Sequence, residues 1–419
     1  MDTLLSTGLT DSVTMPMKAR SNDVPRAEAA GESGATSAAK RPVSALVETY
    51  APLPIELVSG TGARVVDSTG KAYWDFYGGH AVALLGHAHP AVTAAVARQA
   101  GTLTFYSTAA PLAVRTRAAD RLAAFAPEPL QRVFFCNSGT EANEHALQIA
   151  IRRTGRRTIA ALDGAFHGRT LLSVSATGDP KLHQPLGELL APTVRLRPNE
   201  VADLARLTDA VAAVIVEPIL STAGIVELSP AYLTALRRRC DELGILLIYD
   251  EVQTGMGRLG RPFAAGRFDV LPDLVTIAKG MANGIPMGAV LMTPEIAAGI
   301  ALGAMGSTFG GGPVACAALL AVLETLEREG VVRHAGELGA RMRSSLRVGP
   351  VTEVLGQGCL IGLRVRGAAK AVQSALLKEG FVVGTSAAPD VVRLLPPLNL
   401  PFEAIDDLRT ALAGMGSSI

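Results

Sequence analysis

Short apolar runs alternate with helical segments from about residue 90 onward. The runs are rich in β-branched residues, and intervening segments such as 90–100 and 114–126 have apolar positions at helical spacing. Strands separated by helices in this way are typical of βα units on a mostly parallel sheet. We predict strands of such a sheet at residues 132–136, 158–162, 212–218, 245–251, 274–278 and 288–292.

The two ends of the chain follow other patterns. Residues 1–45 are rich in Ser, Ala, Gly and Thr and contain no aromatic residue, which favours a loose tail or an arm that orders on a partner subunit. Residues 62–76 alternate apolar and polar positions around Ser68–Thr69–Gly70 and predict a hairpin. After a long helix that begins near Gly310, strand patterns and a final helix predict a smaller α+β domain. We therefore expect a tail at 1–45, a first segment of the small domain at 46–90, a large domain at 91–312 and the rest of the small domain at 313–419.

Composition and charge exclude several classes of protein. Of the 419 residues 48% are hydrophobic and 18% charged, which excludes disorder of the whole chain. The formal net charge of +1 gives no electrostatic reason to expect a nucleic acid or an anionic membrane as partner. No apolar run reaches the roughly 18 residues of a membrane span, and the N-terminus does not resemble a signal peptide. The four cysteines are widely separated with no C-x-x-C pair, so we expect no disulfide scaffold or structural zinc and a cytoplasmic location.

Ligands of parallel sheets gather at the carboxyl ends of the strands, so the residues that follow the apolar runs are candidates for chemistry. After the run 132–136, Ser138 and Glu141 have the spacing of a capping box that opens a helix. Gly139 lets the backbone approach a ligand, and the free N–H groups of a helix start favour a phosphate or a carboxylate. An ordinary capped helix is the alternative. A weaker second candidate of this kind is the segment 307–312.

A buried acid and a scarce lysine follow two other runs. Asp250 ends a strongly apolar strand, where a carboxylate needs a cationic or hydrogen-bonding partner. It is also compatible with a helix cap or a metal site, although no His or acid cluster with ligand spacing lies near it, and we expect no metal. Among only seven lysines, Lys279 alone follows an apolar strand directly, where it is either a lysine at a strand end or a nucleophile with a lowered pKa. An anion cradle, an acid and such a lysine are together the parts of a pyridoxal-phosphate site.

Motifs in order along the chain resemble a known family. They include GHAHPAV, FFCNSGTEANE, FHGRTL, VEPI, LLIYDEVQTGMGRLG, AKGMANGIPMGAV, GSTFGGGP and VVRLLPPLNL, and the resemblance covers about residues 47–415. The chain resembles the class III aminotransferases of fold type I, in particular the acetylornithine and ornithine aminotransferases. The resemblance implies an α/β fold, with a large domain built on a mostly parallel seven-stranded sheet flanked by helices and a smaller α+β domain.

The resemblance also implies roles around the cofactor pyridoxal 5′-phosphate (PLP). Lys279 matches the lysine that bonds the cofactor aldehyde and moves protons, and Asp250 matches the acid that pairs with the ring nitrogen. Thr308 matches a threonine that reaches the phosphate from a second subunit, which implies a homodimer with shared active sites. The other cofactor-binding positions implied are Ser138, Gly139, Thr140, Phe166, Glu217, Val252 and Gln253.

Substrate recognition is implied for four further residues. Arg393 matches an arginine that binds an α-carboxylate, and Arg169 matches one that binds the second carboxylate of glutamate or 2-oxoglutarate. Tyr50 matches a tyrosine that lines the substrate pocket, and His80 stands where ornithine aminotransferases have a tyrosine. Arginine has a planar fork of donors suited to a carboxylate, so two of them imply a dicarboxylate partner.

Some positions depart from the family pattern. Thr222 replaces a glutamate that normally neutralises the α-carboxylate arginine, which puts pure ornithine ω-transamination in doubt. The run 217–221 resembles dialkylglycine decarboxylase, although that enzyme lacks an arginine at the position of Arg169. Gly312 stands where acetylornithine enzymes usually have Asn.

We therefore expect a PLP-dependent aminotransferase with a ping-pong mechanism. It would move an amino group between glutamate/2-oxoglutarate and an amino acid or its semialdehyde of the N-acetylornithine or ornithine type. The alternatives are a decarboxylating relative on the same fold and a catalytically silent cofactor-binding protein. A nicotinamide-dependent dehydrogenase lacks support because its glycine fingerprint is absent.

Overall fold

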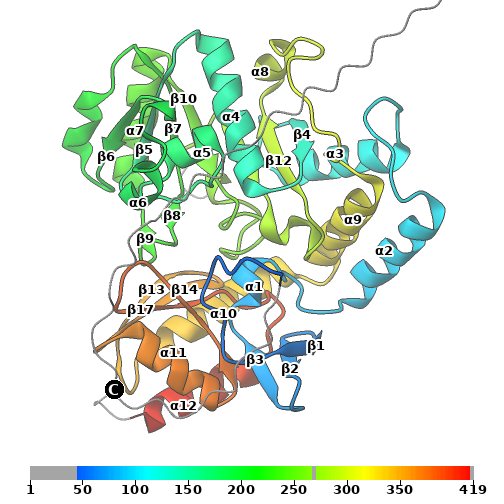
Figure 1. Ribbon diagram of the computed structural model, residues 1–419, viewed down its shortest axis with the longest axis vertical. Coiled ribbons are helices and arrows are strands. Elements are labelled where there is room, and N and C mark those ends of the chain that lie inside the picture. Colours follow the sequence, from blue (N-terminus) through cyan, green and yellow to red (C-terminus); the bar gives the residue numbers. More distant parts are fainter. Residues whose placement is uncertain (1–44, 267–269, 416–419) are drawn as a thin grey trace, which may run out of the picture. The chain divides into compact units, whose positions relative to one another are not determined.

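The computed structural model describes residues 45–266 and 270–415, so the tail expected at 1–45 lies outside the described residues except for its last residue. By its contacts the chain divides into two units, Met1–Pro52 and Leu53–Ile419. All helices and strands of the described residues belong to the second unit (Figure 1).

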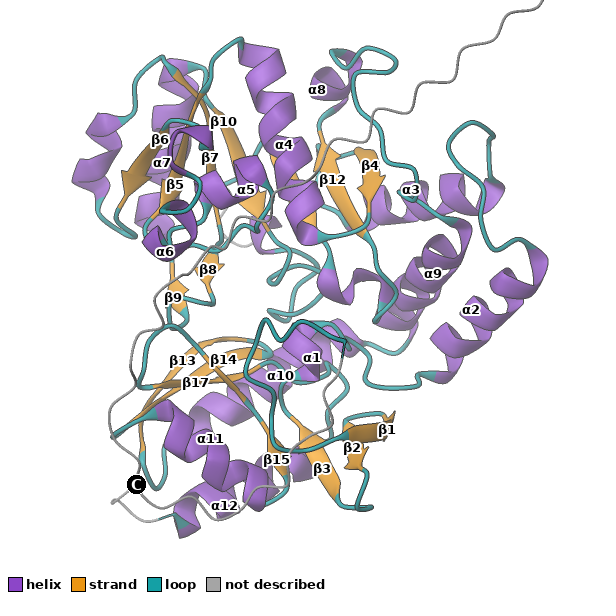
Figure 2. Ribbon diagram, viewed as in Figure 1, coloured by secondary structure: helices purple, strands orange, loops and turns teal. Residues whose placement is uncertain are grey.

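A seven-stranded sheet contains every strand predicted from the apolar runs (Figure 2). Its order is β4-β12-β11-β10-β7-β5-β6. The strands are β4 (Arg132–Cys136), β5 (Thr158–Leu162), β6 (Thr193–Leu196), β7 (Val211–Val216), β10 (Leu246–Asp250), β11 (Leu274–Ile277) and β12 (Gly288–Met292). Strands β11, β10, β7, β5 and β6 pair in parallel, whereas β12 is antiparallel to both of its neighbours. The prediction of a mostly parallel sheet is therefore confirmed, with β6 as a strand that the sequence did not reveal.

Helices cover both faces of this sheet, and alternate residues of one strand pack against different helices. Ile215 and Ile248 belong to one apolar cluster with residues of α4, whereas Val214 and Leu247 belong to another with residues of α3, α7 and α9. These helices are α3 (Ala113–Phe125), α4 (Gly139–Thr154), α7 (Pro230–Leu243) and α9 (Pro313–Arg328). Since both faces are buried, the strands read as continuous apolar runs rather than as alternating ones.

Shorter helices and 3-10 turns complete the second unit. The helices are α1 (Gly78–Ala81), α2 (Pro90–Thr102), α5 (Leu171–Ala176), α6 (Pro180–His183), α8 (Pro294–Ala298), α10 (Val331–Ser345), α11 (Ala369–Lys378) and α12 (Phe402–Gly414). The 3-10 turns are η1 (Gly187–Leu189), η2 (Val201–Arg206), η3 (Ala264–Gly266) and η4 (Lys279–Ala282). Within the described residues, no helix is both long and apolar enough to cross a membrane.

Two four-stranded sheets accompany the seven-stranded sheet, and the first of them joins residues from both ends of the chain. They have the orders β1-β2-β3-β15 and β13-β14-β17-β16, and a short pair β8-β9 lies apart from them. The strands are β1 (Leu57–Thr61), β2 (Arg64–Asp67), β3 (Ala72–Asp75), β8 (Ile219–Leu220), β9 (Val226–Glu227), β13 (Val351–Gln357), β14 (Leu360–Val365), β15 (Phe381–Val382), β16 (Gly384–Thr385) and β17 (Val391–Leu394). The predicted hairpin is confirmed, because β2 and β3 pair antiparallel. The division into a large and a small domain stays a prediction.

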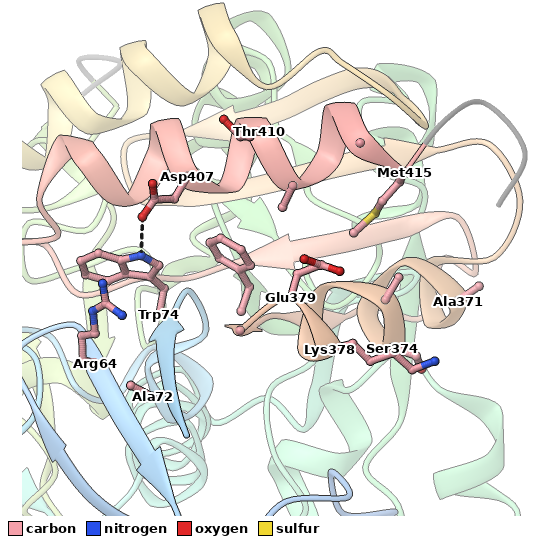
Figure 3. A pocket seen from close by; sticks show the side chains of 15 residues that line it. Arg64, Ala72, Trp74, Ala371, Ser374, Lys378, Glu379, Asp407, Thr410 and Met415 are labelled. Carbon is pink, nitrogen blue, oxygen red and sulfur yellow. Dashed lines mark hydrogen bonds between the residues drawn. The ribbon is translucent and has the colours of Figure 1, made fainter. Parts of the chain in front are cut away.

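The sole tryptophan ties the first of these sheets to the last helix. Trp74 of β3 donates from Nε1 to Oδ2 of Asp407 in α12 at 2.9 Å, and the guanidinium of Arg64 lies 3.6 Å from the Trp74 ring (Figure 3). β3 also pairs in parallel with β15. The segment that follows β3 is thereby fixed against the C-terminal third of the chain.

Candidate active site

The carboxylate of Asp250, the last residue of β10, is buried and held by three groups. Oδ2 accepts a hydrogen bond from Nδ2 of Asn143 at 2.7 Å and lies 2.7 Å from Nδ1 of His167. Oδ1 accepts from the backbone N–H of Val252 at 3.0 Å. Among the described residues, no Lys or Arg forms an ion pair with Asp250. A buried carboxylate in this position favours a further cationic donor, and Oδ1 retains a lone pair for it.

Asn143 and His167 connect Asp250 to α4, to β11 and to the loop after β5. Asn143 of α4 also donates to the backbone oxygen of His167 at 2.7 Å and accepts from Oγ1 of Thr276 of β11 at 2.6 Å. The backbone N–H of His167 donates to Oγ1 of Thr177 at 3.0 Å, which fixes the loop after β5. Asp250 is therefore oriented by a network of hydrogen bonds whose members restrain one another.

Lys279 follows β11 and begins η4 with a left-handed backbone, φ 42°. A left-handed conformation is strained for a residue with a side chain, and such strain clusters at functional sites. Burial lowers the pKa of the Lys279 amine, the charges of Asp250 and Glu217 oppose this shift, and the charge of Arg393 adds to it. Lys279, Asp250 and Glu217 thus stand at the carboxyl ends of β11, β10 and β7 of the seven-stranded sheet, and Arg393 of β17 is near enough for its charge to act on Lys279.

Glu217 is the first residue after β7, and its side chain is buried. Its Oε1 accepts from the backbone N–H of Phe166 at 2.9 Å, which links the ends of β7 and β5. Burial raises the pKa of the Glu217 carboxyl to about 7, His167 opposes the shift, and the charge of Asp250 adds to it. A buried acid of this kind supports the loop that carries Phe166, whose ring lies 5.9 Å from the Arg169 guanidinium.

The start of α4 is capped as predicted, with one difference. Oγ of Ser138 accepts from the backbone N–H of Glu141 at 3.3 Å. The carboxylate of Glu141 does not return to the N–H of Ser138 but accepts from that of Asn137 at 2.6 Å. The reciprocal bond thus goes to the residue before the cap, Asn137, which is the first residue after β4. A Cβ on Gly139 would lie only 2.8 Å from Cγ1 of Val252, so glycine lets this helix start approach the loop after β10.

The hydroxyl group of Thr140 binds the loop after β5. Its Oγ1 accepts from the backbone N–H groups of Arg169 and Thr170 at 3.1 and 3.2 Å. A Cβ on Gly168 would lie 2.2 Å from the same oxygen. The hydroxyl therefore positions the loop that carries Arg169, and the helix start keeps backbone N–H groups as donors for an anion.

The loop after β10 presents a polar atom without a partner. Oε1 of Gln253 is buried and accepts no hydrogen bond within the described part of the protein, and Nε2 of His167 is in the same state. Buried polar atoms are nearly always paired, so each such atom calls for an explanation. Gln253 and its half-buried neighbour Val252 lie in the loop that follows Asp250.

Arg393 of β17 is buried among uncharged acceptors. Its Nε donates to the backbone oxygen of Thr385 at 2.7 Å, Nη1 to Oγ of Ser221 at 3.2 Å and Nη2 to the hydroxyl of Tyr77 at 3.2 Å. No carboxylate of the described residues lies within ion-pair distance of it. The hydroxyl of Tyr77 also lies 2.8 Å from Nδ1 of His80.

The remaining predicted residues are Arg169, Thr308 and Tyr50. Arg169 and Thr308 are exposed. Thr308 lies beside Ser307, whose Oγ accepts from Nδ2 of Asn137 at 3.1 Å, so the second predicted anion segment meets the start of α4. Tyr50 belongs to the first unit, and its role stays a prediction.

Sequence reasoning missed Tyr77, Asn143 and the role of His167 in orienting Asp250. Asn143 was detectable in part, because it is a polar residue on the face of α4 that otherwise carries Ala142, Ala146 and Leu147. In residues 45–266 and 270–415, no group of three His, Cys, Asp or Glu side chains could hold a metal ion.

A parallel sheet with a buried acid, a lysine and a capped helix start at its carboxyl edge is the frame of a PLP-type transferase. Residues 46–415 match the class-III aminotransferase family, and the chain belongs to this family. It is 43% identical over 376 residues to an acetylornithine aminotransferase of Mycolicibacterium smegmatis, a match that spans 88% of this chain and 95% of the relative. An acetylornithine aminotransferase of Methanopyrus kandleri is 41% identical over 378 residues, 89% of this chain and 96% of the relative.

Solved structures agree with this assignment. The crystal structure of the ornithine aminotransferase from Toxoplasma gondii superposes with a TM-score of 0.83 at 31% identity, over 88% of this chain and 92% of that one. A second structure of an ornithine aminotransferase from this organism, with PLP at partial occupancy, gives a TM-score of 0.83 at 30% identity, over 90% of this chain and 92% of that one. The predicted fold class and the prediction of an aminotransferase are therefore confirmed.

Proposed function

We propose that the protein binds pyridoxal 5′-phosphate and moves an amino group between glutamate/2-oxoglutarate and a second amino acid or its semialdehyde. The names of the relatives make N-acetylornithine and ornithine the first candidates for that second substrate. The observation that carries the proposal is the placement of two groups at the carboxyl ends of the adjacent strands β10 and β11. These groups are a buried, network-held carboxylate, Asp250, and an amine with a lowered pKa, Lys279.

The side chains around these two groups fit the cofactor. Oδ1 of Asp250 has room for the proton of a ring nitrogen, and the unpartnered Oε1 of Gln253 suits the ring hydroxyl. Val252 and Phe166 would be the apolar contacts for the two ring faces. The start of α4, with Ser138, Gly139 and Thr140, would hold the phosphate, joined by Thr308 of a second subunit.

Bound there, PLP supplies an aldehyde carbon that takes up an amino group and a ring that accepts electron density from the substrate carbon. The Lys279 amine would hold the cofactor covalently and, once released, move a proton to and from the substrate carbon. Its lowered pKa favours the neutral, basic form that both tasks require. The charge of Asp250 would keep the ring nitrogen protonated, and Asn143 and His167 keep the carboxylate aimed.

Two arginines support a dicarboxylate donor. Arg393 is buried without a carboxylate partner among the described residues, so an incoming carboxylate would compensate its charge. Arg169 would hold the second carboxylate of glutamate from the loop after β5. Glutamate would leave as 2-oxoglutarate before the second substrate enters the same site, which is the ping-pong order.

We also propose a homodimer with shared sites. The exposed rings of Phe105 and Phe309 pack on each other at 5.0 Å beside Thr308. Arg115 fixes both loops, because it donates to the backbone oxygens of Tyr106 and Gly311 at 2.7 and 2.8 Å. Exposed aromatic residues on fixed loops are typical of subunit interfaces.

The donor specificity of the holoenzyme tests this proposal. Each candidate donor, with glutamate first and then N-acetylornithine and ornithine, is mixed with the enzyme while the cofactor absorbance is followed. We expect glutamate to convert the cofactor to its amine form and one oxo acid or semialdehyde to reverse the change. A protein that binds PLP but reacts with no donor would be the catalytically silent alternative.

A decarboxylating transaminase is the second candidate, favoured by the run Ile219–Leu220–Ser221, of which Ser221 bonds Arg393. Carbon dioxide release from a 2,2-disubstituted amino acid distinguishes the two candidate functions. A decarboxylating transaminase releases carbon dioxide from this substrate, whereas an aminotransferase does not.

A further inference from the structure

Arg393 is oriented by groups that leave its charge intact. Two of its three donor positions meet hydroxyl groups, those of Ser221 and Tyr77, and the third meets a backbone oxygen. A carboxylate partner would compete with a substrate for the guanidinium, whereas a hydroxyl orients it without neutralising it. Both contacts to hydroxyls are 3.2 Å long, so the orientation of Arg393 depends on how firmly each hydroxyl is held.

The Tyr77 hydroxyl is held from its other side by His80. An arginine only donates, so the Tyr77 oxygen accepts from Arg393 and its own proton points elsewhere. Nδ1 of His80, at 2.8 Å, receives this proton when the imidazole is neutral. The two rings also contact each other, with their centroids 4.6 Å apart and their planes tilted by 54°. Burial, and then the neighbouring charges of Arg393 and Lys279, lower the pKa of His80, which favours the neutral imidazole.

The backbone is built to put Tyr77 and His80 in these places. Oδ1 of the buried Asp75 accepts from the N–H groups of Tyr77 and Gly78 at 2.9 and 2.8 Å. The next turn is left-handed at four successive positions, and His80 and Ala81 adopt φ 65° and 67° in it although they carry side chains. Left-handed backbone is disfavoured for residues with a side chain, so this conformation is retained against its intrinsic preference.

The sheet also makes room for the Tyr77 ring directly beside Arg393. Gly384 of β16 pairs with Arg393 of β17 in register. A Cβ on Gly384 would lie 2.0 Å from Cε2 of Tyr77, so the ring occupies the space that any other residue would fill. Tyr77 is therefore restrained by its backbone, by His80 and by this glycine.

We propose that Tyr77 is a positioning residue for Arg393 and that, with His80, it sets the affinity of the enzyme for substrates that carry a carboxylate on the reacting carbon. The inference rests on the proposed function, because it assumes that Arg393 binds the α-carboxylate of glutamate. It adds a residue pair that fixes how the guanidinium is presented. Arg393 positioned in this way binds the carboxylate equally well in the ground state and in the transition state. Loss of the positioning should therefore raise KM and leave kcat unchanged.

The test uses holoenzyme and steady-state kinetics with glutamate as donor. Tyr77→Phe removes the hydroxyl and keeps the ring, and we expect KM for glutamate to rise about tenfold with kcat within about twofold, since a hydrogen bond to a charged group is worth about that factor. Gly384→Ala keeps the hydroxyl but displaces the ring, and we expect the same rise in KM. Tyr73→Phe is the matched control, because Tyr73 also loses a hydroxyl bond, to Oδ2 of Asp67 at 2.7 Å, away from Arg393.

The outcomes separate the inference from the function beneath it. A wild-type holoenzyme that does not react with glutamate refutes the proposed function itself. With an active wild type, the positioning role is overturned if KM in both variants stays within twofold of the Tyr73→Phe control. It is also overturned if kcat or PLP affinity falls while KM does not change, because this would be a structural effect. If Tyr77→Phe does not fold, Gly384→Ala gives the same decision.

Discussion

Lys279 and Asp250 stand out as single residues because of where their charge is placed. Asp250 ends a mostly apolar buried strand and Lys279 comes shortly after another, and at such positions a charge is costly unless it serves a partner. Their residue types and places were therefore visible in the sequence. Asn143, His167 and Tyr77 were not, because Asn, His and Tyr fit many local contexts. Their importance depends on pairings such as Asn143 with Asp250, across 107 residues, and Tyr77 with Arg393, across 316.

The lowered pKa of Lys279 predicts a pH dependence for cofactor capture. Only the neutral amine attacks an aldehyde, and its fraction grows as the pH rises through the pKa. Because burial holds this pKa below the ordinary 10.5, the rate at which the cofactor-free protein captures PLP should reach half its maximum below pH 10.5. Asp250→Asn removes a charge that raises the pKa, so it should move the half-maximum to still lower pH.

The rate is measured by absorbance over a series of buffers, with free Nα-acetyl-lysine as the reference amine. A half-maximum at or above that of the reference amine, or a shift to higher pH in Asp250→Asn, would contradict the account.

At the scale of elements, the strands and the capped helix were predictable and their mutual approach was not. The runs at 132–136, 158–162 and 288–292 match β4, β5 and β12 residue for residue, since continuous apolar β-branched runs have few alternatives. β6 was not predicted, because Thr193 and Arg195 interrupt its apolar pattern. The cap at Ser138 was predictable from its own motif, whereas the return of Glu141 to Asn137 depends on how β4 ends.

The close approach of α4 to the loop after β10 predicts an effect of Gly139→Ala. The new methyl group would lie 2.8 Å from Cγ1 of Val252 and would push the helix start away from the proposed phosphate position. Overpacking of this kind costs about 1–3 kcal/mol, so PLP affinity should fall by about tenfold or more. Equilibrium titration of the cofactor-free protein measures the change.

A matched control is Gly101→Ala in α2, where a Cβ meets nothing within 4 Å and the affinity should not change. Adding Val252→Ala to Gly139→Ala should restore part of the lost affinity. An unchanged affinity in Gly139→Ala would show that the helix start does not hold the phosphate.

For the whole molecule, the resemblance of the sequence to a known family predicted the fold class and the family, and both predictions are confirmed. The α/β architecture follows from local patterns, since strands that alternate with helices have few ways to bury their apolar faces. The parallel pairing of β3 with β15 joins residues 74 and 381 and could not be read from local pattern. The subunit arrangement and the identity of the second substrate are properties of partners that the chain meets, and they stay proposals.

The proposed homodimer predicts the effect of a charge in the exposed aromatic pair. Phe309→Arg places a cation against Phe105 and the same surface of a second copy, so the protein should become monomeric and lose most of its transaminase activity. Leu189→Arg, at an exposed leucine away from this pair, is the control and should remain dimeric and active. Light scattering gives the mass. A wild type that is monomeric yet fully active would rule out shared sites.

The most direct test of the account is to locate the covalent bond to the cofactor. Holoenzyme is reduced with borohydride, digested and analysed by peptide mass spectrometry. We expect the pyridoxyl phosphate label on the peptide that contains Lys279, and neither label nor visible cofactor absorbance in Lys279→Ala. A label on another lysine, or turnover by Lys279→Ala, would contradict the assignment of this edge of the sheet as the active site.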